Sequence, residues 1–257
     1  MNRNIQRVHF RASTAAKAQE AYHNLIHIYE DTSPEEADAI VVLGGDGSML
    51  QTLHDSMNFG KPVYGMNYGS VGFLMNDYRE ENLLERISRS IEYTFHPLKM
   101  TIFKEDGQFS EILAINEVSI LRQSFRAAKL KVMIDDKIRL DELICDGLLV
   151  STPVGSTAYN LSAHGPILPL EAPLLALTPV SPFRPRRWRG ALLPNHVRVD
   201  IQVLEPHDRP VNAIADHTGV RLALRIQIAQ FAGVTMRILS DADRSWSDRI
   251  LTEQFSV

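Results

Sequence analysis

The stretch AIVVLGGDGSML, residues 39–50, decides the fold of the N-terminal part of the chain. Its first five residues are wholly apolar, which suits a strand buried on both faces of a parallel sheet. Glycines interrupt this run, and Ser48–His54 then has a helical pattern. Glycine lets backbone amides approach a ligand closely, and a helix N-terminus favours anions. The stretch therefore predicts an α/β domain with a ligand-binding turn, in which Gly45 and Gly47 contact the ligand.

The glycine turn contains an acid, Asp46. A carboxylate repels a phosphate, so it is useful there only if it holds a cation, binds a ligand hydroxyl or takes a proton from one. All three needs arise when a hydroxyl attacks a nucleoside triphosphate. The alternative is that Asp46 caps the N-terminus of the helix that begins at Ser48. The turn is neither a Walker loop nor a G-x-G-x-x-G dinucleotide fingerprint.

The alternation of strand and helix continues on both sides of this turn. A helical pattern precedes it at Ala15–Tyr29, and Pro62–Met66 forms the next apolar strand. A second glycine-rich turn follows in GMNYGSVGFL (65–74). Neighbouring parallel strands end at one crevice, where ligands of open α/β sheets bind. Asn67 could hydrogen-bond a ligand there and Phe73 could stack on a base. This stretch alone, however, favours a turn followed by a core Phe73.

After Phe95 the pattern changes to short β segments. They are rich in Val, Ile, Leu and Thr, and Asp, Gly, Pro and Asn lie between them. The segments are 97–104, 111–121, 130–134, 197–204, 211–215, 220–228 and 234–239. We predict an α/β domain over 1–95 and an antiparallel β domain over 96–239. The polar, helical tail 240–257 is expected to pack back on the first domain.

Two polar residues interrupt the apolar segment EILAINEVSIL (111–121). Asn116 and Glu117 lie at its centre, and successive strand residues point to opposite faces. At least one of the pair should therefore face the interior or an interface, and a buried carboxylate without a partner is costly. A sugar with vicinal hydroxyls is one suitable partner. An ion pair between Glu117 and a nearby Arg or Lys, such as Arg122, is the alternative.

The stretch CDGLLVSTPVGSTAYNLSAHGPI (145–167) is the most informative part of the second half. A strand leads into a Pro-Gly turn and a short helix that Ser156 or Thr157 could cap. Its many hydroxyl groups could bind polar ligand edges, and Tyr159 could stack on a base and still hydrogen-bond. A capped helix with ordinary surface hydroxyls is the alternative. No neighbouring His and carboxylate suggest a serine nucleophile.

Composition excludes several classes of protein. The 27 basic and 31 acidic residues give a net charge of −4, so no overall positive field holds nucleic acid or an anionic membrane. The one cysteine, Cys145, excludes an intrachain disulfide and a cysteine-rich zinc site. With no apolar run of about 20 residues and no apolar leader, we expect a cytoplasmic protein. The Arg-rich loop FRPRRWRG (183–190) is expected to lie at a surface or subunit interface.

Taken together, GGDGSML, NEVSI and DGLLVSTPVGSTAYNLSAHGPI, in this order, resemble the NAD kinase family. PVYGMNYGSVGFL (62–74) resembles the second turn of the same family. The GGDG turn alone also occurs in diacylglycerol kinases and phosphofructokinases, whereas the long STPVGSTAYNLSAHGP block is specific. In two places the sequence departs from the family pattern, with Ser48 where Thr is common and His164 where Gly is frequent.

The resemblance implies a Rossmann-like α/β N-terminal domain, a β-sandwich C-terminal domain and a tail that returns to the first. It implies phosphorylation of the adenosine ribose 2′-hydroxyl of NAD by ATP, with magnesium carried on the ATP and no separate metal site in the chain. NAD and ATP would be the partners, in a homodimer or homotetramer. A diacylglycerol-type lipid kinase and a non-catalytic nucleotide-binding regulator are the alternatives.

The resemblance also implies roles for individual residues. Asp46 matches the catalytic acid-base residue, and Asn116 and Glu117 match the pair that contacts the adenosine ribose and the phosphate region. The positions around the adenine are Phe73, Thr157, Ala158 and Tyr159. Asp146 and Ser162 match the nicotinamide-riboside side. Asp216, in IADHTG, stands near a position where the family often has a ligand-binding acid.

Overall fold

The computed structural model divides the chain into two compact units. It describes residues 3–57, 59–68, 72–105, 107–243 and 246–255, so residues 69–71 of the second glycine-rich turn lie outside the described residues. The first unit comprises residues 1–95 and 234–257, and the second comprises 96–233. The division after Phe95 coincides with the change of pattern in the sequence. The return to the first unit begins at Val234, six residues before the expected tail.

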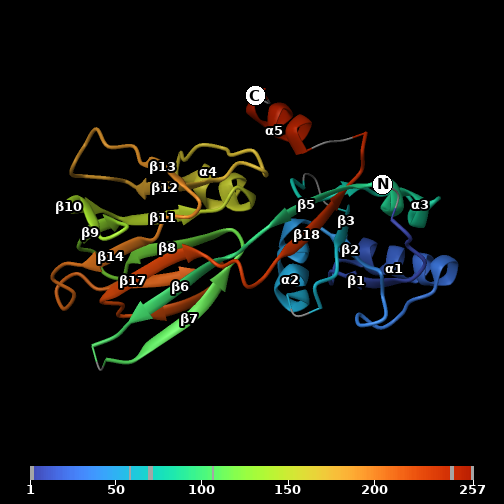
Figure 1. The fold of residues 1–257 in the computed structure, drawn as a ribbon, viewed down its shortest axis with the longest axis horizontal. Helices are drawn as coiled ribbons and strands as arrows, with labels where there is room; N and C mark the ends of the chain where they lie inside the picture. The colour runs from blue at the N-terminus through green and yellow to red at the C-terminus, as the bar shows by residue number, and fades with distance from the viewer. Residues whose placement is uncertain (1–2, 58, 69–71, 106, 244–245, 256–257) are drawn as a thin grey trace. The chain divides into compact units, whose positions relative to one another are not determined.

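The first unit alternates strands with helices, as Figure 1 shows. Its elements are β1 (Val8–Ala12), α1 (Ala16–Tyr29), β2 (Ala39–Gly44), α2 (Asp46–Ser56), β3 (Val63–Asn67), β4 (Asn76–Asp77), α3 (Leu83–Arg89), β5 (Ile91–Phe95), β18 (Met236–Ser240) and α5 (Trp246–Phe255). Among the described residues, no helix is both long enough and apolar enough to cross a membrane.

The strands of the first unit form one sheet in the order β1-β2-β3-β18-β5, with β4 beside β3. The pairs from β1 to β18 are parallel, and β5 closes the edge antiparallel to β18. The placement of residues 234–239 among the strands of the β domain was therefore wrong. Period-two alternation predicts a strand but does not say which sheet it joins.

The core of the first unit explains why this sequence folds as α/β. All six residues of β2 are buried, as its unbroken apolar run requires in the middle of a parallel sheet. Helix α1 lays Ala18, Ala21 and Leu25 on the sheet, at the spacing of one helix face. Leu239 of β18 joins the same core cluster. The C-terminal segment therefore contributes to the core of the N-terminal unit.

The second unit is built of strands and two short helical turns. Its elements are β6 (Leu98–Phe103), β7 (Phe109–Ala114), β8 (Glu117–Arg122), β9 (Ala128–Ile134), β10 (Lys137–Cys145), β11 (Gly147–Ser151), the 3₁₀ turn η1 (Val154–Thr157), α4 (Tyr159–Ser162), β12 (Leu174–Val180), β13 (Ala191–Pro194), β14 (Val199–Val203), β15 (Val211–Ala215), β16 (Thr218–Arg221) and β17 (Arg225–Gln230).

These strands form two sheets that share one core. One sheet has the order β10-β9-β14-β17-β6-β7 and the other β13-β12-β11-β8-β15-β16, and all of their pairs are antiparallel. Met100 of the first sheet and Ile120 of the second are both fully buried in the same cluster. The second unit is therefore the antiparallel β-sandwich expected for the second domain. The fold class predicted from the sequence is confirmed.

The segment 111–121 is divided between these two sheets. Residues up to Ala114 belong to β7, and β8 begins at Glu117 in the other sheet. The expectation that Asn116 and Glu117 lie at the centre of one strand was therefore wrong. Ile115 and Asn116 form the crossing between the sheets, and this places the polar pair at a strand end instead of inside the ladder.

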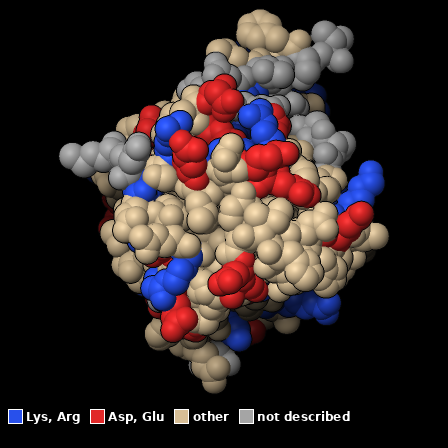
Figure 2. Space-filling model, turned by 90° about the vertical axis from the view of Figure 1, so that its right-hand side faces the viewer, with Lys and Arg blue, Asp and Glu red and all other residues tan. Residues whose placement is uncertain are grey.

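The charges are unequally divided between the units. The first unit has 11 basic and 17 acidic residues, whereas the second has 16 and 14. On the face shown in Figure 2, acidic and basic side chains lie side by side around an uncharged central area. Ion pairs of the first unit include Glu85–Arg89 at 2.7 Å and Arg3–Glu92 at 3.1 Å.

Candidate functional site

The two glycine-rich turns of the first unit meet at the ends of neighbouring strands. Gly44 at the end of β2 is in register with Asn67 at the end of β3. The Tyr68 amide donates a hydrogen bond to the Gly44 carbonyl at 2.9 Å. Asn67 is half-buried at this position. The carboxyl ends of parallel strands are where ligands of open α/β sheets bind, so this edge is the first part of a candidate site.

Asp46 is the first residue of α2 and binds the second turn. Its two carboxylate oxygens accept hydrogen bonds from the backbone amides of Phe73, at 2.8 Å, and Leu74, at 3.0 Å. The helix begins after Gly45, and no side chain caps it. The alternative that Asp46 is only a helix cap is therefore wrong. Each carboxylate oxygen has a second lone pair, which leaves Asp46 able to accept a proton or a further hydrogen bond.

The surroundings of Asp46 act on its charge in opposite directions. Burial raises the pKa of the Asp46 carboxyl above its ordinary value, because the charged form loses hydration. The amides of Leu74 and Phe73 and the positive charge of Arg249 act to lower the pKa, but burial prevails. A carboxylate with a raised pKa is a stronger base than an ordinary aspartate, which suits a group that receives a proton.

Gly45 and Gly47 have open space where a side chain would stand. A Cβ atom built on either residue meets no atom within 4 Å. At Gly44, by contrast, it would lie 2.6 Å from Ser48 Oγ. The packing of the described residues therefore explains the glycine at position 44 but not those at 45 and 47. Those two leave bare backbone for a ligand to approach.

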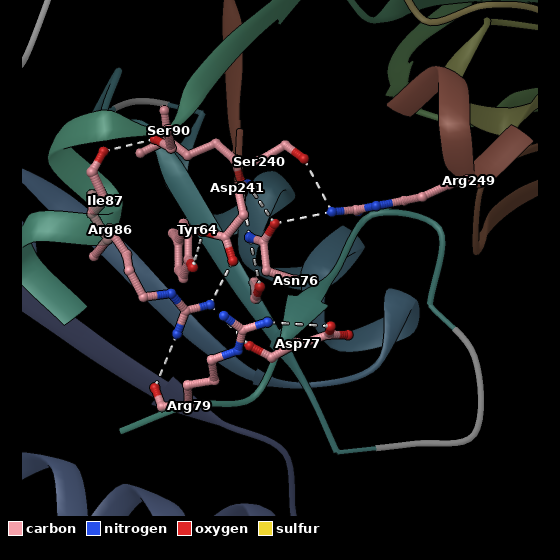
Figure 3. Close-up of polar contacts among 12 residues, drawn as sticks. Tyr64, Asn76, Asp77, Arg79, Arg86, Ile87, Ser90, Ser240, Asp241 and Arg249 are labelled. Atoms are coloured by element: carbon pink, nitrogen blue, oxygen red, sulfur yellow. Dashed lines mark hydrogen bonds and ion pairs between the residues drawn. The ribbon is translucent and has the colours of Figure 1, made fainter. Parts of the chain in front are cut away.

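A buried polar network lies beside the second glycine-rich turn, 65–74, and the sequence analysis did not predict it (Figure 3). Asn76 donates to the carbonyls of Gly65 and Leu239, both at 3.0 Å, and so joins β3 to β18. Its side-chain oxygen accepts from the Asp241 amide at 2.9 Å. Asp241 in turn accepts from the Tyr64 hydroxyl at 2.6 Å and pairs with Arg86 at 2.5 Å. No local sequence pattern links these residues.

In the second unit, Asp216 organises the crossing between the two sheets. Its carboxylate accepts hydrogen bonds from the amides of Ile115 at 2.6 Å, Asn116 at 2.9 Å and Glu117 at 3.2 Å. Asp216 lies in the turn between β15 and β16 with a left-handed φ of 51°. Aspartate tolerates this conformation better than most residues. Asp216 thus fixes the two residues predicted to bind ribose.

Glu117 is buried close to Asp216. Its side chain is 8% exposed, and Oε2 has no hydrogen-bond partner among the described residues. Burial and, second, the negative charge of Asp216 raise the pKa of Glu117 to about 8. The alternative of an ion pair with Arg122 is wrong, since Arg122 Nε pairs with Asp146 Oδ1 at 2.6 Å. A buried oxygen without a partner marks a group that is available to a ligand.

The turn after β11 packs directly on Asn116. The Thr152 amide donates to the Asn116 carbonyl at 2.9 Å, and the Thr152 hydroxyl donates to the Ile115 carbonyl at 2.7 Å. A Cβ atom on Gly155 would lie 2.2 Å from the Asn116 carbonyl oxygen. The 3₁₀ turn and the crossing segment therefore form one rigid structure within the second unit. Asn116 itself remains partly exposed.

Ser156 has a different place from the one expected. It is fully buried, its hydroxyl donates to the Pro153 carbonyl at 2.7 Å, and it accepts from the Leu168 amide at 3.0 Å. It does not cap α4 and neither does Thr157, because the helix begins after Ala158 without a side-chain cap. The Ser156 side chain therefore holds the turn together and does not line a surface.

Sequence reasoning also missed Asn160. It is fully buried, donates to the carbonyls of Ser156 at 3.1 Å and Pro166 at 2.9 Å, and accepts from the Thr178 hydroxyl at 2.7 Å. A Cβ atom on Gly165 would lie 2.1 Å from Asn160 Oδ1. An asparagine inside a short helix with a glycine five residues later was the available signal.

The remaining predicted residues of this turn are accessible. Thr157 and Ala158 are partly exposed, Tyr159 is 37% exposed and Ser162 is exposed. Asp146 is exposed enough to reach a ligand while it pairs with Arg122. In the first unit Phe73 is half-buried, with its amide on Asp46. Each unit thus gathers its own group of predicted residues.

Among the described residues, no group of three or more His, Cys, Asp or Glu side chains could hold a metal ion. The candidate site contains three acids. Asp46 lies at the glycine-rich turns of the first unit, and Glu117 and Asp216 lie at the crossing between the two sheets of the second unit.

Comparison with curated relatives shows full-length similarity. The chain is 64% identical over 256 residues to the NAD kinase of Rhizobium meliloti (strain 1021), with 100% of both chains covered. It is 56% identical over 248 residues to that of Brucella suis biovar 1 (strain 1330), with 96% of both covered. It is 52% identical over 253 residues to that of Caulobacter vibrioides (strain ATCC 19089 / CIP 103742 / CB 15), covering 98% of this chain and 97% of the relative.

Two solved structures share the fold. The crystal structure of yeast NADH kinase complexed with NADH has a TM-score of 0.82 at 22% identity, covering 99% of this chain and 90% of that one. The crystal structure of an NAD kinase from Archaeoglobus fulgidus in complex with ATP has a TM-score of 0.75 at 23% identity, covering 93% and 95%. At these identities the likeness concerns the fold.

The family models match both units. The ATP-NAD kinase N-terminal domain matches residues 1–94, and the ATP-NAD kinase C-terminal domain matches residues 115–225. Most of the chain is therefore covered by two models in the order that the family requires. With the acid in its glycine turn and relatives identical at more than half of their positions, the chain belongs to the NAD kinase family.

Proposed function

We propose that Asp46 is the group that receives the proton when the adenosine ribose 2′-hydroxyl of NAD is phosphorylated. As a member of its family, the chain is an ATP-dependent phosphotransferase that acts on an alcohol group. The comparisons do not favour the lipid kinase or the non-catalytic regulator. The observation that carries the proposal is the half-buried Asp46 carboxylate at the end of β2, beside two glycines with open space.

In the proposed step the 2′-oxygen of NAD attacks the γ-phosphorus of ATP. The oxygen–phosphorus bond to NAD forms, the bond between the γ-phosphorus and the bridging oxygen breaks, and ADP leaves. The hydroxyl proton passes to Asp46. The raised pKa of Asp46 supports this role, because it makes the carboxylate a better proton acceptor. The amides of Phe73 and Leu74 fix the carboxylate so that its free lone pairs keep one direction.

The open backbone at Gly45 and Gly47 supports an anion-binding role for the first turn. We propose that Gly45 and Gly47 lie against phosphate oxygens, at the start of α2 where the helix dipole favours negative charge. Asn67, at the end of β3, would hydrogen-bond the substrate. A side chain at position 45 or 47 would fill the space that the ligand needs.

In the second unit, Asn116 and Glu117 are proposed to bind the ribose and the phosphate region. Asp216 supports them by fixing their amides. With its pKa near 8, Glu117 is mostly protonated at neutral pH and can donate a hydrogen bond to a ligand oxygen. A sugar hydroxyl or a phosphate oxygen could satisfy the buried Oε2 atom.

The bases would be bound by accessible residues around the two turns. We propose that Tyr159, Thr157 and Ala158 of the second unit contact the adenine, because an aromatic face stacks on a base. Phe73 of the first unit is assigned to adenine binding by the same family resemblance. Asp146 and Ser162 are assigned to the nicotinamide-riboside side. Ser156 supports this site indirectly. Its hydroxyl hydrogen-bonds Pro153 and Leu168 and so maintains the conformation of the turn.

The divalent cation is proposed to be magnesium that enters as part of the ATP substrate. Magnesium keeps several waters and binds one or two carboxylates together with substrate phosphates. A cation carried on the ATP phosphates in this way needs no closed cage of protein ligands. The cation would neutralise charge on the transferring phosphoryl group.

We propose that the chain forms a homodimer or homotetramer, and that the Arg-rich loop 183–190 contributes to a contact between copies. Its four arginines are exposed, and Arg184 and Arg186 lie over the ring of Phe183, which is 51% exposed. Trp188 packs on the core of the second unit and fixes the loop. Sedimentation of Arg186→Glu at low and high salt tests this role, and an unchanged molecular mass would contradict it.

A cytoplasmic location is part of the same proposal. The one thiol of the chain, Cys145, is buried, and burial raises its pKa to about 12. A thiol of this kind is unreactive and suits a packing role in a reducing compartment.

The proposed function is tested by incubating the purified chain with ATP, magnesium and NAD. The NADP formed is measured with a dehydrogenase specific for it. Asp46→Asn should lower kcat by about 10²- to 10⁴-fold while NAD still binds. Asp55→Asn, on the same helix and exposed, is the matched control. Near-wild-type turnover of Asp46→Asn would remove Asp46 from the chemistry. Diacylglycerol in a parallel reaction tests the lipid kinase.

A further inference from the structure

The C-terminal helix α5 places one guanidinium inside the polar network of the first unit (Figure 3). Arg249 is 8% exposed, although arginine is rarely buried without partners. Its Nη1 donates to the Phe73 carbonyl at 2.9 Å. Its Nη2 donates to Asn76 Oδ1 and to Ser240 Oγ, both at 3.0 Å. These three acceptors come from two segments more than 160 residues apart in the chain.

Phe73 is therefore bound on both sides of its backbone. Its carbonyl accepts from Arg249, and its amide donates to Asp46 at 2.8 Å. The next amide, that of Leu74, binds the other oxygen of Asp46 at 3.0 Å. The position of the Phe73–Leu74 backbone thus determines the orientation of the Asp46 carboxylate.

The other two residues that Arg249 contacts, Asn76 and Ser240, are fixed in the sheet. Asn76 is 1% exposed and binds the backbone of β3 and of β18. Ser240 is the last residue of β18. The Arg249 guanidinium hydrogen-bonds Asn76, Ser240 and Phe73. It therefore connects the second glycine-rich turn to the sheet.

We propose that Arg249 is a positioning residue for Asp46, which holds the Phe73–Leu74 backbone at the place where its amides orient the carboxylate. This inference rests on the proposed role of Asp46. It assigns a part in the reaction to the C-terminal helix, which lies outside the two segments matched by the family models.

Arg249 also acts on Asp46 through its charge. Of the described residues, Arg249 is the charged side chain on another element that lowers the pKa of Asp46. On α2 itself, Asp55 is paired with Arg11 at 2.6 Å. Loss of the guanidinium charge should therefore raise the pKa of Asp46 further, so that activity falls at a higher pH on the acid side.

The test compares Arg249→Met and Arg249→Lys with the matched pair Arg89→Met and Arg89→Lys. Arg89 is exposed and pairs only with Glu85 across one helical turn in the described structure. For each variant, kcat and KM for NAD are measured from about pH 5 to 9. Fluorescence of Trp246, which is buried on α5, reports whether the helix remains in place when Trp188 is replaced by Phe in every protein compared.

For Arg249→Met we expect kcat to fall about 10-fold or more with KM for NAD within about 2-fold, because orientation and not binding is lost. The acid side of its pH profile should move up by about half a unit or more. Arg249→Lys keeps the charge but not the planar fork, so its kcat should fall while its pH profile stays near wild type. The Arg89 variants should match wild type in both.

A purely structural role of Arg249 would lower thermal stability without moving the pH profile of the folded protein. Native Trp246 fluorescence with a wild-type kcat and pH profile in Arg249→Met would overturn the inference. If that variant does not fold, wild-type kcat in a folded Arg249→Lys would overturn it instead. Failure of the proposed function is distinguishable, because it appears as an active Asp46→Asn regardless of Arg249.

Discussion

Asp216 and Glu117 are joined by a reciprocal pair of hydrogen bonds. The Glu117 amide donates to Asp216 Oδ1 at 3.2 Å, and the Asp216 amide donates to the Glu117 carbonyl at 3.1 Å. Two acids are thereby held together. The negative charge of Asp216 is one cause of the raised pKa of Glu117. The arrangement keeps a carboxyl group protonated beside a carboxylate that binds backbone amides.

Asp216→Asn should destabilise the second unit. The asparagine would present an NH₂ group where an oxygen now accepts backbone amides, so at least one buried amide would lose its acceptor. The expected loss in the free energy of unfolding is about 1–3 kcal/mol. Urea denaturation measures it. Asp208→Asn, an exposed ion-pair partner of Arg126, is the control and should change stability by less than about 0.5 kcal/mol. Equal stability of the two variants would contradict the bracing role of Asp216.

Glu117→Gln should stabilise the protein increasingly as the pH rises. In the folded state the Glu117 pKa is about 8, whereas an unfolded glutamate titrates near its ordinary value of about 4.3. Between these values the folded state binds more protons, so wild-type stability falls with rising pH by at most about 1.4 kcal/mol per unit. Glutamine carries no charge to bury. Thermal unfolding of both proteins at pH 5, 7 and 9 should show a growing difference, and a constant difference would contradict the raised pKa.

The sequence predicts the first half of the site because its signals are local. The apolar run 39–43, the glycines and the following helix identify a strand end with Asp46 beside it, and that is what the structure contains. The pairing of β2 with β3 follows from the general rule that parallel strands end at one edge. The sequence did not show that Asp46 binds the amides of Phe73 and Leu74 and not those of its own helix.

The rest of the site depends on contacts between distant residues. The crossing at Ile115–Asn116 is fixed by Asp216, about 100 residues later, so a pattern of alternating residues predicts one strand where there are two. Residues 236–240 alternate like the strands of the β domain, yet they pair with β3 and β5 of the α/β unit. Arg249 is similar, because its partners lie up to 176 residues away in the chain.

Gly155 and Gly47 should respond to alanine in opposite ways. In Gly155→Ala the new Cβ would lie 2.2–2.5 Å from backbone atoms of Asn116, so the turn or the crossing must move. We expect a loss of stability of about 1–3 kcal/mol, as for overpacking. In Gly47→Ala the Cβ meets nothing within 4 Å, and alanine in α2 should raise stability by up to about 1 kcal/mol.

Measurements of activity on these variants test the role proposed for Gly47. Gly47→Ala should lower turnover despite its stable fold, because the new methyl group occupies the space proposed for phosphate oxygens. Thermal melting and the NADP assay, run on the same preparations, measure both quantities. A Gly47→Ala enzyme with wild-type kcat and KM for ATP and NAD would show that no ligand approaches the backbone there.

The pH dependence of the wild-type enzyme should report the ionisation of Asp46. As a proton acceptor, Asp46 works only in its charged form, and burial raises its pKa above the ordinary value of about 3.9. The value of kcat/KM should therefore be constant around neutral pH and fall about tenfold per unit once the pH is below the raised pKa. Binding of NAD, measured by calorimetry over the same range, is the control for unfolding or loss of affinity.

In Asp46→Asn the residual activity should lose this acid limb, since asparagine does not titrate. An identical limb in wild type and Asp46→Asn would mean that another group titrates, and Glu117→Gln, whose lost carboxyl has a pKa near 8, would be the next variant to compare.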